Sequence, residues 1–413
     1  MAAWETPYYI GDVVKDQKKL VVRTPQQFKE MQDIDVKTEH RVTKIDPKGK
    51  RIEVVNLANS QTQWFSYDQL IIATGARSRR LNIPGNDSKN VFTLKDLQDS
   101  IHIKNYIDEK KPGQVAVLGG GFIGLEMCEA FRLRNMETFL FCRRDLPAGN
   151  LEKEISEKIL KELQENGIHF ITYQEPAAFR LDSNGEVTSL ETNQTHFPAD
   201  MVLVAVGVIP NAEIAKEAGA ELGKTGAIRT VTAQRTNLTD IYTAGDCCEV
   251  FNLVSQDWVY TPLGDISNKQ GRVVGENAAG GNASFSGVVG SAALKVFELE
   301  VAFTGLGMQV ARQYGFDVDS QVIEAESKVG YMPGSKRMLI KLIFDRKNGR
   351  LLGAQMAGKE GVARRINALA VALHQNMTID EISRLDFAYA PPFSGTLDPI
   401  LIAGEQAAKK MQK

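Results

Sequence analysis

A short glycine-rich segment constrains this chain more than any other part of its sequence. Residues Val115–Leu118 form an apolar run that continues into Gly119-Gly-Gly121-Phe-Ile-Gly124 and then into Leu125–Phe131, which has helical spacing. This order predicts a buried β-strand, a tight turn and the start of a helix. Gly119 would permit the turn, Gly121 would let the backbone approach a pyrophosphate, and Gly124 would let the helix pack closely on the strand. Because a strand and a helix flank the pattern, it predicts a dinucleotide-binding site rather than an ordinary glycine-rich turn.

The end of the next predicted strand, Thr138–Cys142, indicates which nucleotide would bind. Roughly 20 residues after the last glycine, an Asp or Glu would hold the ribose 2′-hydroxyl group of NAD. The sequence has Cys142 near that place, followed by Arg143 and Arg144. Arginine binds phosphate through bidentate, charge-assisted hydrogen bonds, so this pair predicts a preference for NADP. The alternative is a solvated basic turn.

Composition and charge exclude several classes of protein. The 413 residues are 43% hydrophobic and 24% charged, and the formal net charge is −2. These values are typical of a soluble globular chain with two or three domains, and they give no general attraction to nucleic acid or anionic membranes. The N-terminal residues do not read as a secretory signal, and the longest apolar run, Met201–Pro210, is too short to cross a bilayer. We therefore expect a cytoplasmic protein without nucleic-acid or membrane partners.

The cysteines and histidines do not form a recognisable pattern. Cys128, Cys142, Cys247 and Cys248 have no disulfide or metal-ligand spacing, and the five histidines are scattered. Cys247 and Cys248 are adjacent, and vicinal cysteines do not usually form an unstrained disulfide. We predict no metal site, and a packing role rather than a redox role for the vicinal pair.

Secondary-structure patterns divide the chain into regions. Residues 1–100 show mostly short β patterns, including Leu20–Arg23, and a short helix with Thr24 as its N-cap. Residues 114–226 alternate strands and helices. From residue 291 onward, antiparallel strands are followed by helices.

Three separated segments extend the meaning of the glycine turn: Ile71–Ala76, Val204–Asn211 and Ile241–Asp246. Any one of them alone would be an ordinary strand followed by a turn. In this order around the glycine pattern, they resemble the pyridine nucleotide–disulfide oxidoreductase family, whose members are flavoproteins with two dinucleotide sites. The resemblance implies that Asp246 binds a ribityl hydroxyl group of FAD. It also implies cofactor-binding roles for four residues of the other two segments: Ala73, Thr74, Gly75 and Gly207.

The C-terminal sequence narrows the resemblance. Asp386–Ser394, which contains Tyr389, and the following Asp398-Pro399 look like the coenzyme A disulfide reductase and NADH oxidase branch. In that branch the C-terminal domain forms a homodimer, and the tail tyrosine points toward the partner's active site. The resemblance therefore implies a catalytic role for Tyr389, whose phenol can donate a proton to a departing thiolate. The alternative is a packing residue at the dimer contact.

The resemblance implies an α/β fold with two Rossmann-like nucleotide-binding domains, the first incomplete, and a C-terminal α+β dimerisation domain. The expected limits are residues 1–112 and 227–290 for the two parts of the FAD-binding domain, 113–226 for the NAD(P)H-binding domain, and 291–413 for the dimerisation domain. The first domain counts as incomplete because family members begin with a flavin-binding glycine pattern and a redox cysteine. This sequence starts at the segment that follows them, with Trp4 about where the cysteine falls.

These features predict an FAD-dependent NAD(P)H oxidoreductase that resembles coenzyme A disulfide reductase. Its cofactors would be FAD and NADPH or NADH, and its substrate a small-molecule disulfide, a polysulfide or a coenzyme A derivative. Two alternatives stay open. One is an NAD(P)H oxidase, in which reduced flavin passes electrons to oxygen. The other is a catalytically silent, truncated nucleotide-binding homodimer.

Overall fold

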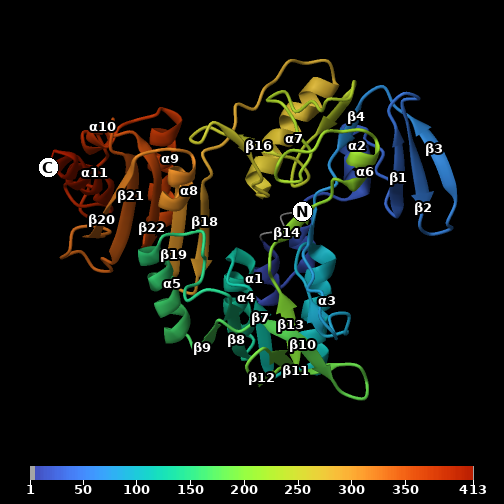
Figure 1. Ribbon diagram of the computed structural model, residues 1–413, viewed down its shortest axis with the longest axis horizontal. Coiled ribbons are helices and arrows are strands. Elements are labelled where there is room, and N and C mark those ends of the chain that lie inside the picture. The colour runs from blue at the N-terminus through green and yellow to red at the C-terminus, as the bar shows by residue number, and fades with distance from the viewer. Residues whose placement is uncertain (1–4, 413) are drawn as a thin grey trace.

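The computed structural model describes residues 5–412, which form three bodies (Figure 1). The middle of the chain, cyan to green, builds a body around a parallel sheet. The last third, orange to red, builds a body around an antiparallel sheet. The third body combines the blue N-terminal part of the chain with the yellow segment that precedes the last third. This mixed α/β architecture confirms the fold class expected from the sequence.

Strands that alternate with helices form the middle body. Its elements are β6 (Val91–Phe92), α3 (Leu97–Lys110), β7 (Gln114–Leu118), α4 (Phe122–Leu133), β8 (Glu137–Cys142), α5 (Lys153–Glu165), β9 (Ile168–Thr172), β10 (Pro176–Leu181), β11 (Val187–Thr192), β12 (His196–Pro198) and β13 (Met201–Val204). The main sheet is parallel, in the order β6-β13-β7-β8-β9, and β10-β11-β12 form a separate antiparallel sheet. Strands β7 and β13 are continuous apolar runs because helices and loops cover both of their faces.

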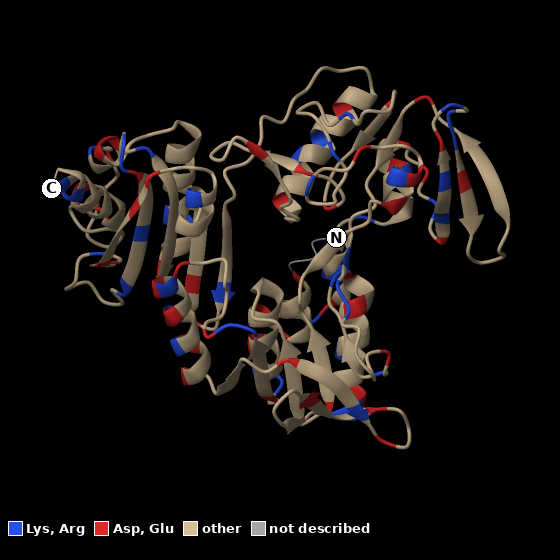
Figure 2. Ribbon diagram, in the orientation of Figure 1, with Lys and Arg blue, Asp and Glu red and all other residues tan. Residues whose placement is uncertain are grey.

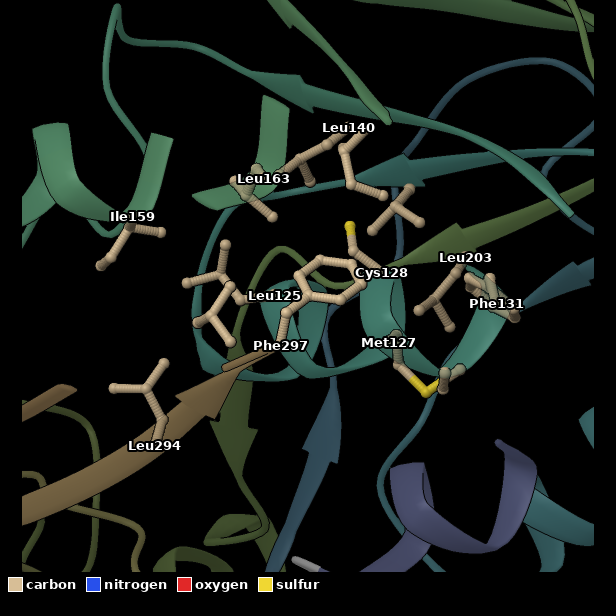
Figure 3. Close-up of a cluster of buried hydrophobic side chains, with 14 of the residues drawn as sticks. Leu125, Met127, Cys128, Phe131, Leu140, Ile159, Leu163, Leu203, Leu294 and Phe297 are labelled. Carbon is tan, nitrogen blue, oxygen red and sulfur yellow. The ribbon is translucent and has the colours of Figure 1, made fainter. Parts of the chain in front are cut away.

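Apolar side chains from the middle body and from the C-terminal third share one hydrophobic core (Figure 3). Helix α5 contributes an amphipathic face, in which Ile155, Ile159 and Leu163 are fully buried. Leu294 and Phe297, from the C-terminal third, lie next to α4 in the same cluster. This shared core fixes α4 and α5 against the C-terminal sheet.

Segments on both sides of the middle body combine to form the third body. Its elements are η2 (Gln17–Leu20), α2 (Pro25–Gln32), β1 (His40–Asp46), β2 (Arg51–Asn56), β3 (Thr62–Ser66), β4 (Leu70–Ile72), β5 (Ala76–Ser78), β14 (Val208–Pro210), α6 (Glu213–Glu217), β15 (Ile241–Thr243), β16 (Val250–Asn252), β17 (Asp257–Val259) and α7 (Gly264–Ala278). Helix α1 (Thr6–Ile10) precedes them in the chain but lies with the middle body (Figure 1). Strands β1-β2-β3 form an antiparallel sheet, and β4 pairs in parallel with β15. Helix α1 packs against α3 and α4 of the middle body.

The strand predicted for Leu20–Arg23 is wrong. Residue Leu20 instead ends the short 3₁₀ helix η2, whose N-cap residue Asp16 accepts a hydrogen bond from the backbone of Lys18. Leu20 is buried, whereas the two following valines are exposed and pair with no strand in the described part of the chain. The apolar run therefore anchors a loop. The predicted N-cap is confirmed, because the Thr24 side chain accepts a hydrogen bond from the backbone of Gln27 at the start of α2.

The C-terminal third forms an antiparallel sheet covered by helices. Its elements are β18 (Ala292–Val296), β19 (Leu299–Gly305), α8 (Met308–Gln313), β20 (Val318–Glu326), β21 (Arg337–Asp345), β22 (Leu351–Gly358), α9 (Val362–His374), α10 (Ile379–Ser383) and α11 (Pro399–Met411). The strand order is β18-β19-β22-β21-β20. Side chains on one sheet face form a core with α9 and α11, and those on the other face join the core of the middle body. Both faces are therefore covered, which explains why β22 is buried along its whole length.

Within residues 5–412, no helix combines the length and the apolar character that crossing a lipid bilayer requires. Nor do these residues place three or more His, Cys, Asp or Glu side chains where they could together hold a metal ion. Acidic and basic residues are distributed over all three bodies (Figure 2).

Candidate functional site

The glycine turn lies between β7 and α4, as the sequence predicts. Gly119 has a φ angle of 112°, and a Cβ atom there would lie 2.4 Å from the carbonyl oxygen of Ala205. A Cβ atom at Gly124 would lie 1.9 Å from the carbonyl oxygen of Gly119, so glycine is required for this close approach of helix and turn. Gly121 is the N-cap of α4, and a Cβ atom there would meet no atom of residues 5–412 within 4 Å. This open space and the amide groups at the start of α4 can receive a phosphate.

A cavity of about 400 Å³ opens beside this turn, and residues from all three bodies line it. Most of its wall is apolar, and Lys95 and Tyr260 supply polar groups. An apolar cavity with a few polar groups suits a flat ring system. The ring of Phe122, from α4, lies 5.6 Å from that of Phe303, from β19. The other lining residues are Thr6, Ser78, Leu94, Gly121, Ile123, Asn150, Val204, Ala205, Gly207, Val208, Thr261, Pro262, Leu263 and Gly290.

Asp246 lies behind this cavity wall, at the loop that follows β15. Its Oδ2 atom is 2.8 Å from the ammonium group of Lys95, and its Oδ1 atom accepts a hydrogen bond from Ser267 at 3.0 Å. The hydroxyl group of Tyr260 donates to the backbone carbonyl of Asp246 at 2.9 Å. Burial, and then the nearby Asp246 carboxylate, raise the pKa of Tyr260. Because Lys95 and Tyr260 both line the cavity, Asp246 is separated from it by one layer of side chains.

The structure brings the Ala73-Thr74-Gly75 turn and the Gly207 segment together. Strands β5 and β14, which directly follow these two turns, pair with each other as an antiparallel ribbon. The hydroxyl group of Thr74 donates to the carbonyl of Asn211, whose side-chain amide donates back to the carbonyl of Thr74 at 2.9 Å. Gly75 and Gly207 both have positive φ angles. Gly207 lines the cavity, whereas Ala73 and Thr74 are exposed.

Arg143 and Arg144 begin the loop that connects β8 to α5. Both are exposed, but only Arg144 is tied into the loop, because its Nη1 atom donates to the carbonyl of Gly149 at 2.8 Å. Cys142, at the end of β8, is buried next to the glycine turn, and a Cβ atom at Gly120 would lie 2.4 Å from its sulfur. The structure thus places two guanidinium groups and no acidic side chain directly after β8.

Tyr389 does not reach this cavity within one chain. Tyr389 lies in the segment between α10 and α11 and is 49% exposed. It is not among the described residues that line the cavity. Arg365 of α9 holds the segment in place by binding the carboxylate of Asp398 at 2.9 Å and the carbonyl of Phe393 at 3.1 Å. Tyr331, Phe393 and Leu397 are also exposed in this body.

The vicinal cysteines are fully enclosed. The hydrogen bond from Cys248 holds the pKa of Cys247 down, to about 6. Its sulfur nevertheless has no exposed surface and lies near the carbonyl oxygens of Ile72 and Ala244. A reactive thiolate needs access to a substrate, so the packing role remains our prediction for this pair.

Sequence reasoning missed Glu126, a buried acid on α4. It is 6% exposed, and its Oε2 atom has no hydrogen-bond partner among the described residues. Burial, followed by repulsion from Glu129, raises the pKa of Glu126 to about 8. With Tyr8 of α1 it lines a small space between α1 and α4. The sequence did contain a signal for this residue. Glu126 is a charged residue two positions after the last glycine, on the apolar side of a predicted core helix.

Two family models match most of this chain. Residues 6–259 match the pyridine nucleotide-disulphide oxidoreductase model, and residues 291–399 match the dimerisation domain of the same family. These matches confirm the resemblance that the sequence motifs suggested.

Individual relatives differ in their described activities. The chain is 33% identical to an NADH oxidase from Methanocaldococcus jannaschii, with 98% of this chain and 90% of that protein covered. It is 30% identical to a coenzyme A disulfide reductase from Staphylococcus haemolyticus, with 97% of this chain and 89% of that protein covered. A solved NAD-dependent persulfide reductase from A. fulgidus superimposes with a TM-score of 0.96 at 35% identity, covering 100% of this chain and 76% of the other.

Proposed function

Because this chain belongs to the pyridine nucleotide-disulphide oxidoreductase family, we propose that it transfers electrons from NADPH or NADH through FAD to a small disulfide, polysulfide or coenzyme A persulfide. The family consists of enzymes that use FAD and NAD(P)H. The electron acceptor and the preferred nicotinamide nucleotide are our proposals.

One observation carries this proposal. The glycine turn that can receive a pyrophosphate opens into the cavity whose other walls come from the ribbon, from the start of α7 and from the C-terminal sheet. A nucleotide bound at Gly121 would therefore extend toward a space that an isoalloxazine ring can share. Such proximity is what hydride transfer between two cofactors requires.

The residues around the cavity fit the ring and ribityl parts of a flavin. Helix α7 begins at the cavity wall, and its N-cap residue, Leu263, offers no side-chain cap, so the first amide groups of this helix can meet an electronegative ring edge. Lys95 would contact the ribityl hydroxyl groups directly. Asp246, which lies behind Lys95, would hold its ammonium group in place. When bound, FAD supplies the hydride-accepting ring. The protein supplies positioning and a mostly apolar wall that limits access of water.

Arg143 supports a preference for NADPH. Its exposed guanidinium group follows β8 directly, where an acidic residue would favour NAD. We propose that Arg143 provides the main contact to the 2′-phosphate, with Arg144 beside it. The hydrogen bond from Arg144 to Gly149 makes Arg144 partly a support for the loop.

A second copy of this chain would complete the site. The C-terminal third carries the family's dimerisation domain, and its exposed apolar side chains include Tyr389 and Phe393. Exposed apolar patches often mark protein contacts. We propose that the chain forms a homodimer in which Tyr389 approaches the cavity of the partner and donates a proton to the departing thiolate.

A sequence of three measurements tests this function. The purified protein should become yellow and retain flavin absorbance after FAD is added and excess is removed. Anaerobic addition of NADPH should then bleach the flavin, and coenzyme A disulfide or polysulfide should restore its absorbance. A protein that stays colourless after FAD is added would reject both the reductase and the oxidase, and would favour the silent nucleotide-binding dimer.

An NAD(P)H oxidase is the second candidate, because a relative at 33% identity is described as an NADH oxidase. The two enzymes differ in what reoxidises the reduced protein. If oxygen restores the flavin absorbance at a rate that disulfides and polysulfides do not increase, the oxidase is the better description.

A further inference from the structure

A buried lysine joins the nucleotide-binding body to the C-terminal sheet. Lys341 lies in the middle of β21 and is only 4% exposed. Its ammonium group lies 2.9 Å from the carboxylate of Glu152 and 2.8 Å from that of Glu154, at the start of α5. A buried charge is costly unless it is paired. This cluster therefore ties the start of α5 to one place on the sheet.

Glu152 receives two more contacts from the same body. Its backbone amide donates to the side chain of Gln355 at 2.7 Å, and its Oε1 atom accepts a hydrogen bond from the backbone amide of Met308 at 2.8 Å. Gln355 is the direct cross-strand neighbour of Lys341. The N-cap residue of α5, Glu152, is thus held by β21, by the neighbouring strand β22 and by the start of α8.

The loop just before Glu152 is the one that begins with Arg143 and Arg144. Its other fixed point is Ala148, whose amide donates to the carbonyl of Gly120 in the glycine turn at 2.8 Å. Ala148 has a φ angle of 50°, a left-handed conformation that costs a non-glycine residue about 1 kcal/mol. Such a conformation persists only where its surroundings hold it. The loop is therefore fixed at Ala148 against the glycine turn and at Glu152 against the C-terminal body.

We propose that Lys341, acting through Glu152, is a positioning residue for the loop of residues 143–151 and so sets the affinity for a 2′-phosphorylated nucleotide. This inference rests on the proposed NADPH site. Lys341 contacts no nucleotide itself. It holds Glu152, the residue that ends the loop. Nucleotide affinity therefore depends on the position of the C-terminal sheet relative to α5.

Binding of two fragments of NADPH separates this role from general stability. Adenosine 2′,5′-bisphosphate probes the loop, and nicotinamide mononucleotide probes the cavity. In isothermal titration calorimetry, Lys341→Met should bind the bisphosphate about tenfold more weakly, while its affinity for the mononucleotide should not change. The ratio of NADPH to NADH affinity should fall by a similar factor.

Lys359→Met is the matched control. Lys359 also joins the sheet to α5, by an ion pair of 2.9 Å with Glu162, but at the opposite end of the helix from the loop. This variant removes an ion pair between the same sheet and helix, at a more exposed side chain (43% for Lys359 against 5% for Lys341), and should bind both fragments normally. If Lys341→Met fails to fold, Glu152→Gln provides a second variant, because it keeps the backbone hydrogen bond to Gln355 and weakens the ion pair with Lys341.

The possible outcomes distinguish the inference from the function on which it rests. If the unsubstituted protein binds neither fragment, the proposed site and this inference both fail. If the unsubstituted protein binds both fragments, equal losses for the two fragments in Lys341→Met, or no loss for either, would overturn the inference alone. An equal loss of bisphosphate affinity in Lys359→Met would also overturn it.

Discussion

The glycine turn and the Tyr389 segment are candidate parts of one site, but they differ in position: the turn lies beside the cavity, and Tyr389 does not line it. Gly119, Gly121 and Gly124 lie at the junction of β7 and α4, and described residues of one chain line the cavity beside them. Tyr389 lies on an outer surface, away from that cavity. The backbone of the glycine turn sets the geometry of its own nucleotide site within one chain. The role of an exposed side chain such as Tyr389 depends instead on the molecule that packs against it.

This difference gives the two regions different sensitivities to substitution. Changes near the turn should affect stability and nucleotide binding in the isolated chain. Changes at Tyr389 should affect only the step that involves the acceptor, because the phenol contributes little to the fold of its own chain.

The largest effect should come from Glu126→Gln and should depend on pH. The pKa of Glu126 is raised from 4.5 to about 8 in the folded protein. Between these values the unfolded chain loses a proton that the native protein keeps, so the stability of the unsubstituted protein falls as pH rises. Glutamine carries no such proton. Glu126→Gln should therefore gain stability relative to the unsubstituted protein as pH rises, up to about 5 kcal/mol above pH 8.

Urea unfolding across this pH range measures that difference. Glu162→Gln is the control, because Glu162 is also buried but is paired with Lys359 at 2.9 Å and accepts a hydrogen bond from the backbone amide of Glu298. The control should lose stability instead. A Glu126→Gln profile parallel to that of the unsubstituted protein would show that the pKa of Glu126 is not raised by folding.

Two alanine substitutions in the turn should separate packing from binding. Gly124→Ala places a Cβ atom 1.9 Å from the carbonyl oxygen of Gly119 and should cost about 3 kcal/mol of stability. The Cβ atom of Gly121→Ala meets no atom of the described residues within 4 Å. It should unfold at nearly the same temperature as the unsubstituted protein but bind NADPH much more weakly, because the methyl group occupies the approach to the pyrophosphate. Thermal unfolding and a fluorescence titration with NADPH would test both, and equal effects in the two variants would contradict these separate roles.

Arg143→Ala should have a smaller and more selective effect. Loss of a charge-assisted contact to the 2′-phosphate should weaken NADPH binding by about 2 kcal/mol and leave NADH binding unchanged. Arg144→Ala should change the ratio less, since its Nη1 atom is used within the loop. Unchanged selectivity in both variants would leave the basic turn without a role in nucleotide choice.

Tyr389→Phe should have the smallest effect on the isolated chain. Stability and NADPH affinity should stay the same, because the hydroxyl group is on an exposed side chain. If Tyr389 donates a proton to the leaving thiolate, turnover with a disulfide should fall by about 100-fold while flavin reduction by NADPH keeps its rate. A normal disulfide turnover would assign Tyr389 to packing at the dimer contact.

The sequence predicted those parts of the fold whose local and global signals agree. The apolar run of β7, the glycines that follow it and the amphipathic face of α5 each have one stable solution, because burial and backbone geometry favour the same structure. Leu20–Arg23 shows the opposite case. Its apolar residues suited a strand, but a 3₁₀ helix begins at the Asp16 cap, and no strand in the described part of the chain pairs with this segment.

The candidate site was predictable to the same extent. Gly119 and Gly124 could be assigned local structural roles from spacing, because Gly119 has a positive φ angle and a Cβ atom at Gly124 would contact Gly119. The binding role of Gly121 stays a prediction. Lys95 and Glu126 could not be assigned, because their roles arise from contacts between segments distant in the sequence: Lys95 meets Asp246 across 151 residues. The ion pairs of Lys341 with Glu152 and Glu154 could likewise not be predicted from the sequence of β21 alone.

The β5–β14 ribbon has a consequence for how this architecture can change. Ser78 and Val208 are paired neighbours, so the chain leaves the third body and returns to it at adjacent points. The intervening residues behave as an insertion whose two ends already meet. Insertions of this kind can be lengthened, exchanged or replaced without altering the path of the host chain. A nucleotide-binding unit could thus be transplanted between proteins of this architecture, provided that the recipient's C-terminal sheet makes the same contacts with α5.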